Sequence, residues 1–273
     1  MQTIKDKINK IEIVTAGIVE LIDKIKLILQ DTEIPNLSPD ITNEIFYHLI
    51  NNYKFSPEFA YDLTKLLCNT VYQKYEFLII DNQKTNNELI TEKIKRNFGT
   101  NIKISALENI KIAIKQIKKN DNLILCESIN NNMSDGWWIY LLETNKEIFT
   151  KLNPDFEENN QQQTHYAIAK LNTKQNYDRS FIIIETSAPV GQNWIKTVLI
   201  KLKIPVYRVV ESVATYKKNV IHLIEITGNI DENDNRIGKE LKINNIKFEI
   251  LKKIGGYFQK INSEENNQLL FLK

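Results

Sequence analysis

The chain has 273 residues, of which 42% are hydrophobic and 26% charged, so it can bury the cores of two or three modules. Its 36 Lys and Arg residues against 34 Asp and Glu give a net charge of only +2, and these charges are scattered, which excludes the basic footprint of a nucleic-acid-binding protein. No window is apolar enough to cross a bilayer and the charged N-terminus is unlike a signal peptide, so we expect a cytoplasmic protein without membrane contacts.

The first 76 residues are predicted to form three helices. Apolar residues recur at helical spacing from residue 3 to about 33, and Pro35 ends the run. Ser38-Pro39 and Ser56-Pro57 each place a capping hydroxyl before a proline at the first helical position, so two further helices should begin there. The pattern indicates an all-α module over residues 1–76.

Residues 77–175 are predicted to form a small α/β module. Apolar runs typical of strands alternate with helical patterns: FLII from Phe77, a helix near 85–97, NIKI at 101–104, a helix near 107–118 and NLILCE at 122–127. The polar run at 153–165 is typical of a loop.

Residues 176–273 show the order β-α-β-β-α-β of a ferredoxin-like module. After the strand YAIAKL at 166–171, the expected elements are FIIIET at 181–186, a helix near 192–202, VYRVVESVAT at 206–215, VIHLIEIT at 220–227, a helix after Asn233 and KFEILKKI at 247–254. The predicted fold class is therefore α+β, with three modules at 1–76, 77–175 and 176–273.

Neither a metal nor another cofactor is expected. The acidic run Asp231–Asn235 suggests a calcium loop, but the sixth and twelfth positions counted from Asp231 hold Arg236 and Lys242, where that loop needs Gly and Glu. The spacing of the cysteines and histidines fits neither a disulfide framework nor a zinc site, so we expect structural roles for Cys68, Cys126, His48, His165 and His222.

Residues 206–257 resemble the ACT regulatory domain that closes prephenate dehydratases. In that family a Glu-Ser pair ends the second strand, and here the pair is Glu211-Ser212. The acidic turn after Gly228 matches the start of the second ACT helix, and Ile254–Tyr257 takes the place of a Leu-Gly-Ser-Tyr-like element. The resemblance implies that Glu211 and Ser212 bind a small effector such as an aromatic amino acid, although VGQNWIKTVL replaces the family's Gly-Ala-Leu stretch at the first helix.

The upstream segments extend the resemblance. Residues 101–131 are similar to a dehydratase stretch that ends in a Pro-Ile-Glu-Asn-Ser-like turn, here Glu127–Asn130. Residues 4–22 resemble the first helix of the all-helical chorismate mutase that is fused ahead of dehydratase in bifunctional enzymes. Helical chorismate mutases pair through this helix, so the resemblance implies a homodimer formed by the N-terminal helices.

The departures from the family argue against prephenate dehydration. The span between Asn131 and Asn176 is too short for a second catalytic lobe, and Asn176–Phe181 stands where the family has Thr-Arg-Phe. The middle of the chain instead carries SDGWWIYLL, with adjacent Trp137 and Trp138. In this feature the chain resembles a group of chorismate mutase-like proteins whose middle region is shortened. Two roles are open for these tryptophans: binding an aromatic ligand, or serving as one core ring and one interface ring.

Chorismate mutase chemistry sets the other candidate residues. The substrate is a dianion that rearranges without a nucleophile or metal, so the protein must supply cations, best as Arg forks, for its two carboxylates and its ether oxygen. By resemblance the catalytic positions fall on Lys5, Thr70 and Lys74. The first 76 residues contain eight lysines and no arginine, and the lysines also suit the solvated faces of amphipathic helices.

Two functional hypotheses follow. The first is a divergent chorismate mutase of aromatic amino-acid biosynthesis, converting chorismate to prephenate with weak or lost activity. The second is a non-catalytic ACT-type protein that senses a small molecule or supports assembly. Both hypotheses imply that the protein binds a small molecule, which is chorismate, prephenate or an aromatic amino acid.

Overall fold

The computed structural model describes residues 49–50, 55–56, 59–60, 62–63, 72–81, 87–129, 136–152, 164–171, 176–215, 219–230, 236, 241–243 and 245–257. They fall in two compact units, residues 1–76 with 94–104, and residues 77–93 with 105–273, and we describe each by itself. The helix predicted over 3–33, the helix start at Ser38 and the helix after Asn233 lie outside the described residues.

In the first unit, a helix begins after Ser56, as the Ser-Pro pair predicts. The backbone N–H of Phe59 donates to Ser56 Oγ at 3.3 Å, and that of Ala60 donates to the Ser56 carbonyl at 2.9 Å. The hydroxyl thus satisfies a donor that the first helical turn leaves without a partner. Tyr72 and Phe98 pack edge-to-face, with ring centroids 4.6 Å apart, and both are buried.

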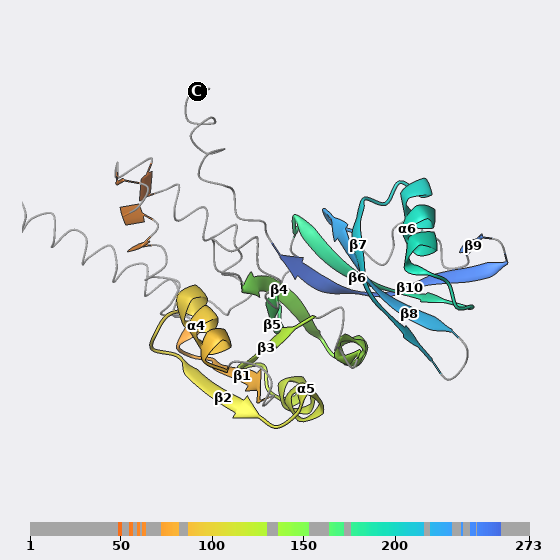
Figure 1. Ribbon diagram of the computed structural model, residues 1–273. Helices are drawn as coiled ribbons and strands as arrows, with labels where there is room; N and C mark the ends of the chain where they lie inside the picture. Colours follow the sequence, from red (N-terminus) through yellow and green to blue (C-terminus); the bar gives the residue numbers. More distant parts are fainter. Residues whose placement is uncertain are drawn as a thin grey trace, which may run out of the picture. The chain divides into compact units, whose positions relative to one another are not determined.

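Strands and helices alternate from Glu76 to Ser128, whereas further along the chain several strands follow one another directly (Figure 1). The elements are β1 (Glu76–Ile80), α4 (Asn87–Phe98), β2 (Lys103–Leu107), α5 (Ile110–Lys119), β3 (Leu123–Ser128), the 3-10 helix η2 (Trp137–Glu143), β4 (Lys146–Leu152), β5 (His165–Lys170), β6 (Arg179–Thr186), α6 (Gln192–Lys201), β7 (Val206–Ala214), β8 (Val220–Thr227), β9 (Leu241–Ile243) and β10 (Ile246–Tyr257). The predicted strands and the helices predicted near 85–97, 107–118 and 192–202 are found, and β2 lies further along the chain than predicted. The sequence did not predict η2, β4 or β9.

The strands form one ten-stranded sheet, so the fold is mixed α+β. Its order is β2-β1-β3-β5-β4-β10-β6-β8-β7, with β9 paired to β10 off this path. The stretch β10-β6-β8-β7 is antiparallel throughout, as the β-α-β-β-α-β pattern predicts. Strands β3, β5 and β4 are also antiparallel neighbours.

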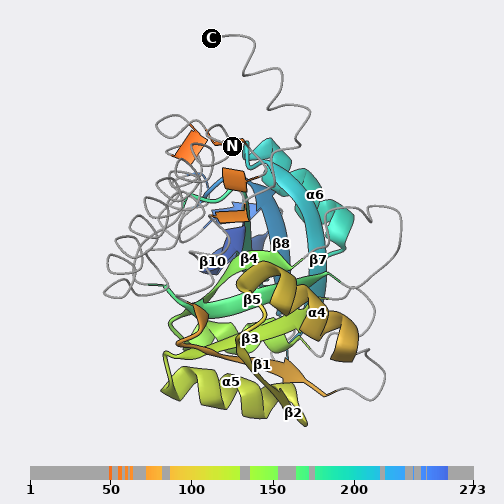
Figure 2. The ribbon, with the colours of Figure 1, turned by 90° about the vertical axis from the view of Figure 1, so that its left-hand side faces the viewer.

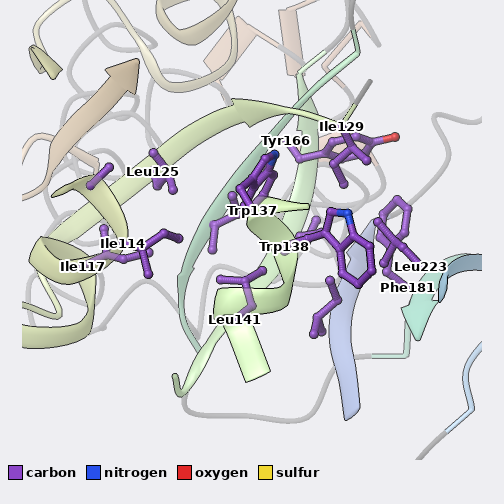
Figure 3. Close-up of a cluster of buried hydrophobic side chains, with 14 of the residues drawn as sticks. Ile114, Ile117, Leu125, Ile129, Trp137, Trp138, Leu141, Tyr166, Phe181 and Leu223 are labelled. Atoms are coloured by element: carbon purple, nitrogen blue, oxygen red, sulfur yellow. The ribbon is translucent and has the colours of Figure 1, made fainter. Parts of the chain in front are cut away.

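The β10-β6-β8-β7 part of the sheet has an apolar core on each face. α6 covers one face in both views (Figure 1 and Figure 2), where its Ile195, Val198 and Leu199 pack against the sheet. Trp194 of this helix stacks on Phe248 of β10, with ring centroids 5.2 Å apart. The other face packs against η2 and β5 in a second core, part of which Figure 3 shows. Because side chains alternate along a strand, each inner strand contributes to both cores.

Two glycines allow β10 to lie close to its neighbours β4 and β6. The strands are parallel neighbours at Gly255 and Ile148. Gly255 has φ +103°, and a Cβ there would lie 2.0 Å from the Ile148 carbonyl oxygen. A Cβ on Gly256 would lie 2.2 Å from the Arg179 carbonyl oxygen of β6. Backbone therefore approaches β10 closely from both sides, which only glycine permits.

The helix α5 begins and ends as its sequence dictates. Asn109 Oδ1 accepts a hydrogen bond from the Ile112 N–H at 3.0 Å, and Lys118 and Lys119 suit the negative end of the helix dipole. The residues of this helix that face the core are Ala113, Ile114 and Ile117. This helical spacing places the apolar stripe against β3.

Candidate functional site

The predicted mutase residues lie mostly beyond the described part of the chain. Lys5 and Thr70 are outside it, whereas Lys74 lies exposed in the turn before β1. The convergence of Lys5 and Lys74 on one pocket therefore stays a prediction.

Both tryptophans of the WW pair are buried in the core between η2 and the sheet (Figure 3). Trp137 is 4% exposed and its Nε1–H donates to the Ser128 carbonyl at 3.0 Å, while Trp138 is fully buried and donates to Glu211 Oε2. Gly136 turns the chain into η2 with φ +62°, close to Val213 of β7. Each indole N–H is thus satisfied within the protein, so the rings serve the core.

The predicted effector pair is divided between the two faces of β7. Glu211 accepts the Trp138 N–H on the face that packs against η2. Ser212 points to the opposite face, where its Oγ lies 2.8 Å from Nδ1 of the fully buried His222. The structure therefore does not bring Glu211 and Ser212 together in one site, although each has a specific buried partner.

A chain of hydrogen bonds fixes the state of His222. Thr186 Oγ1 lies 3.0 Å from His222 Nε2 and donates its own proton to the Ala188 carbonyl at 3.0 Å. Nε2–H must then be the donor to Thr186, and Nδ1 accepts the Ser212 hydroxyl. Burial lowers the pKa of His222 to about 4, so the ring is neutral at physiological pH. A ring of this pKa is a weak base toward Ser212, and its role is structural.

Glu127, at the end of β3, titrates near neutral pH. Burial raises its pKa to about 7, and the Ser128 N–H and hydroxyl, both donating to its Oε1, oppose that rise. A carboxyl that is half protonated near pH 7 could act as a general acid or base. The neighbouring Asn130 of the dehydratase-like turn lies outside the described residues.

The sequence analysis missed a buried ion pair on β7 and β8. Arg208 Nε donates to Glu225 Oε2 at 2.6 Å, and the Tyr257 hydroxyl donates to Oε1 of the same carboxylate at 2.5 Å. The Glu225 side chain is fully buried. The sequence does contain a sign of this ion pair. Glu225 interrupts the otherwise apolar strand VIHLIEIT, and a buried acid requires a buried partner.

Within the described part of the chain, no group of three or more His, Cys, Asp or Glu side chains could hold a metal ion. The rejected calcium loop at Asp231–Asn235 lies outside that part. Among the helices that the structure describes, none has the length and apolarity needed to span a bilayer.

The solved structures that resemble this chain include two distant neighbours. No family model and no curated protein matches the sequence. A prephenate dehydratase from Streptococcus mutans has a TM-score of 0.44 and 11% identity, covering 68% of this chain and 100% of that chain. GqqA, described as a novel type of quorum quenching acylase, has a TM-score of 0.47 and 10% identity, covering 68% of this chain and 95% of its own. Both TM-scores are below 0.5, and we therefore argue function from this chain's own residues.

Proposed function

We propose that this chain is a small-molecule-responsive protein with an ACT-type C-terminal region, and that it is not an active prephenate dehydratase. The observation that carries the proposal is the bond between Glu211 and Trp138. It joins a strand of the proposed sensing region to the central region that holds η2. An effector that binds at Glu211 would thereby act on the central region directly.

The strand arrangement supports an ACT-type region. The antiparallel order β10-β6-β8-β7, with α6 on one face, is the order that a β-α-β-β-α-β chain gives when its first and third strands lie in the middle. Glu211 and Ser212 lie on β7, the strand at the end of the sheet order, as the Glu-Ser pair of an ACT domain would.

The Glu211–Trp138 bond supplies a physical route for the response. The ammonium group of an amino-acid effector would compete with the indole N–H for the Glu211 carboxylate. Releasing the fully buried Trp138 N–H without a partner costs about 1–3 kcal/mol, so effector binding and the position of η2 must be coupled.

Calorimetry with L-phenylalanine, L-tyrosine and prephenate as separate probes tests this proposal. We expect saturable binding of L-phenylalanine or L-tyrosine, weakened roughly tenfold by Glu211→Gln, which removes the charge that an ammonium would recognise; prephenate has no ammonium group and serves as the negative probe. Glu249→Gln is the matched control, because Glu249 is an exposed carboxylate on β10 of the same sheet. Equal affinities in wild type and Glu211→Gln would contradict the role of Glu211.

The N-terminal residues carry a second proposal, a chorismate mutase-type isomerase of aromatic amino-acid biosynthesis with weak or absent activity. The helix that begins at Ser56 supports the predicted helical module, and Lys74 is exposed and accessible to a substrate. The proposed catalytic residues are Lys5, Thr70 and Lys74, and a homodimer through the N-terminal helices would complete the site. An assay of chorismate consumption tests this directly.

A further inference from the structure

One end of the antiparallel sheet gathers the ends of four strands. Arg179, at the start of β6, is the cross-strand partner of both Tyr257 at the end of β10 and Thr227 at the end of β8. Arg208, near the start of β7, is opposite Glu225, two residues before Thr227. Arg179 on β6 and Arg208 on β7 flank β8, and because residues two apart on a strand share a face, both arginines lie on the face that carries Glu225.

The carboxylate of Glu225 is fully used inside the protein. Arg208 Nε and the Tyr257 hydroxyl occupy its two oxygens, at 2.6 and 2.5 Å. A buried carboxylate that is paired with a cation and accepts one further hydrogen bond is compensated for its loss of hydration. Each oxygen of Glu225 therefore already accepts a hydrogen bond from within the protein.

The donors of the two arginines are engaged differently. The Arg208 side chain is 38% exposed, and it donates to Glu225 through Nε while its guanidinium also lies within reach of the Tyr166 hydroxyl. Arg179 donates from Nη1 to Thr227 Oγ1 at 2.6 Å, but its buried Nε has no partner among the described residues. The Arg179 guanidinium lies 3.8 Å from the centroid of the Tyr207 ring, which fixes its plane, and Tyr207 is 51% exposed, so this group reaches the surface.

Tyr166 adds an independent observation. It is fully buried, and its hydroxyl has no hydrogen-bond partner among the described residues. The hydroxyl lies close to Glu225 and Arg208, and burial raises its pKa further, so it stays protonated. An unpaired buried hydroxyl costs about 1–3 kcal/mol, and such groups are rare unless a ligand or water completes them.

We propose that Arg179, Arg208 and Tyr166 bind the carboxylate of a small organic acid. The planar guanidinium groups match the two oxygens of a carboxylate, and the Tyr166 hydroxyl provides a neutral donor. Lys151, whose Nζ lies 5.5 Å from the centroid of the Tyr257 ring, adds positive charge nearby. A singly charged anion is favoured over a phosphate dianion, because Tyr166 is fully buried and binding beside it would desolvate both charges of the dianion. The site is distinct from Ser212, which lies on the opposite face of β7.

Calorimetric titration of the full chain with benzoate tests the proposal. We expect saturable binding that Arg179→Gln weakens about 10- to 100-fold, as one charge-assisted bond requires, and that Tyr166→Phe weakens about 2- to 10-fold. These two positions are chosen because neither holds Glu225, so the buried ion pair stays intact. Lys118→Gln, the loss of an exposed cation on α5, is the matched control and should bind benzoate like the wild type.

The variants also separate this site from a merely structural cluster. Tyr166→Phe should unfold at the same urea concentration as the wild type or a higher one without benzoate, yet gain less stability when benzoate is added. Glu211→Gln, which alters the proposed effector site, should keep benzoate binding, so failure of the proposed effector response would leave this result standing. Absence of saturable benzoate binding, equal affinity in wild type and Arg179→Gln, or stronger binding of inorganic phosphate than of benzoate would overturn the proposal.

Discussion

The contact between Trp138 and Glu211 is the most specific side-chain interaction between η2 and β7. Trp138→Phe keeps an aromatic ring but removes the N–H, which leaves the Glu211 carboxylate without this donor. We expect the free energy of unfolding in urea to fall by roughly 2–4 kcal/mol, from the lost charge-assisted bond and the smaller ring together.

A control separates the hydrogen bond from the ring volume. Trp194→Phe makes the same chemical change in α6, where the ring is half-buried and stacks on Phe248. We expect a smaller loss there. In a double-mutant cycle, Trp138→Phe and Glu211→Gln should be non-additive, and strictly additive effects would show that the two side chains do not interact.

Two buried titratable residues give opposite pH dependences of stability. His222 has a folded-state pKa of about 4 against an ordinary value of 6.5, so between these values the unfolded chain binds the extra proton. Its contribution to stability is present above pH 6.5 and is lost as pH falls toward 4. Glu127 has a folded-state pKa of about 7 against 4.5, so the folded chain binds the extra proton in that window. Its contribution decreases as pH rises from 4.5 to 7.

Glu127→Gln removes the pH dependence of stability that comes from Glu127. The pH dependence that comes from His222 can then be measured by itself. In this variant the free energy of unfolding should rise between pH 4 and pH 6.5 by roughly 2–3 kcal/mol more than in the double variant Glu127→Gln/His222→Gln. Urea titrations at a series of pH values measure this difference. Parallel profiles for the two variants would show that His222 is not held neutral by the fold.

At the scale of elements, the β4–β10 junction depends on one glycine. Gly255→Ala adds a Cβ that would lie 2.0 Å from the Ile148 carbonyl oxygen, on a residue whose φ of +103° is already unfavourable for L side chains. We expect a loss of roughly 3 kcal/mol or more in the free energy of unfolding.

Gly228 provides the comparison for this substitution. It also has a positive φ, +77°, but a Cβ there meets no atom within 4 Å. Gly228→Ala should therefore cost only the conformational term of about 1–2 kcal/mol. Equal losses for the two variants, measured by urea unfolding, would contradict the close approach of β4 and β10.

Much of the element order could be predicted from the sequence, because buried strands such as β1 and β6 contain continuous apolar runs. β4 was missed because it begins with Lys146 and Glu147, a pattern typical of a surface. The structure buries Lys146 completely and pairs its ammonium with Asp121 at 2.5 Å, a contact 25 residues away in sequence. The pairing of Arg208 with Glu225 also could not be predicted. It depends on the register between β7 and β8, which is a long-range property that local spacing does not encode.

For the whole molecule, the mutase proposal predicts slow or undetectable conversion of chorismate to prephenate. Arg forks donate two aligned charge-assisted bonds of about 1.5–3 kcal/mol each, which the lysines of residues 1–76 cannot reproduce. Losing two such interactions lowers the rate by roughly two to four decades. Following chorismate absorbance measures the rate. A kcat of order 10 per second that Lys5→Ala or Lys74→Ala abolishes, and that Lys118→Ala leaves intact, would show that the site is fully active.

The central claim is that effector binding on β7 acts on η2 through Glu211 and Trp138. Hydrogen exchange of the Trp137–Glu143 backbone, with and without L-phenylalanine at a concentration that saturates binding, tests it most directly. We predict that the effector changes the exchange rates of these amides in the wild type and leaves them unchanged in Trp138→Phe. Binding of L-phenylalanine to the wild type with no change in exchange across Trp137–Glu143 would contradict the claim.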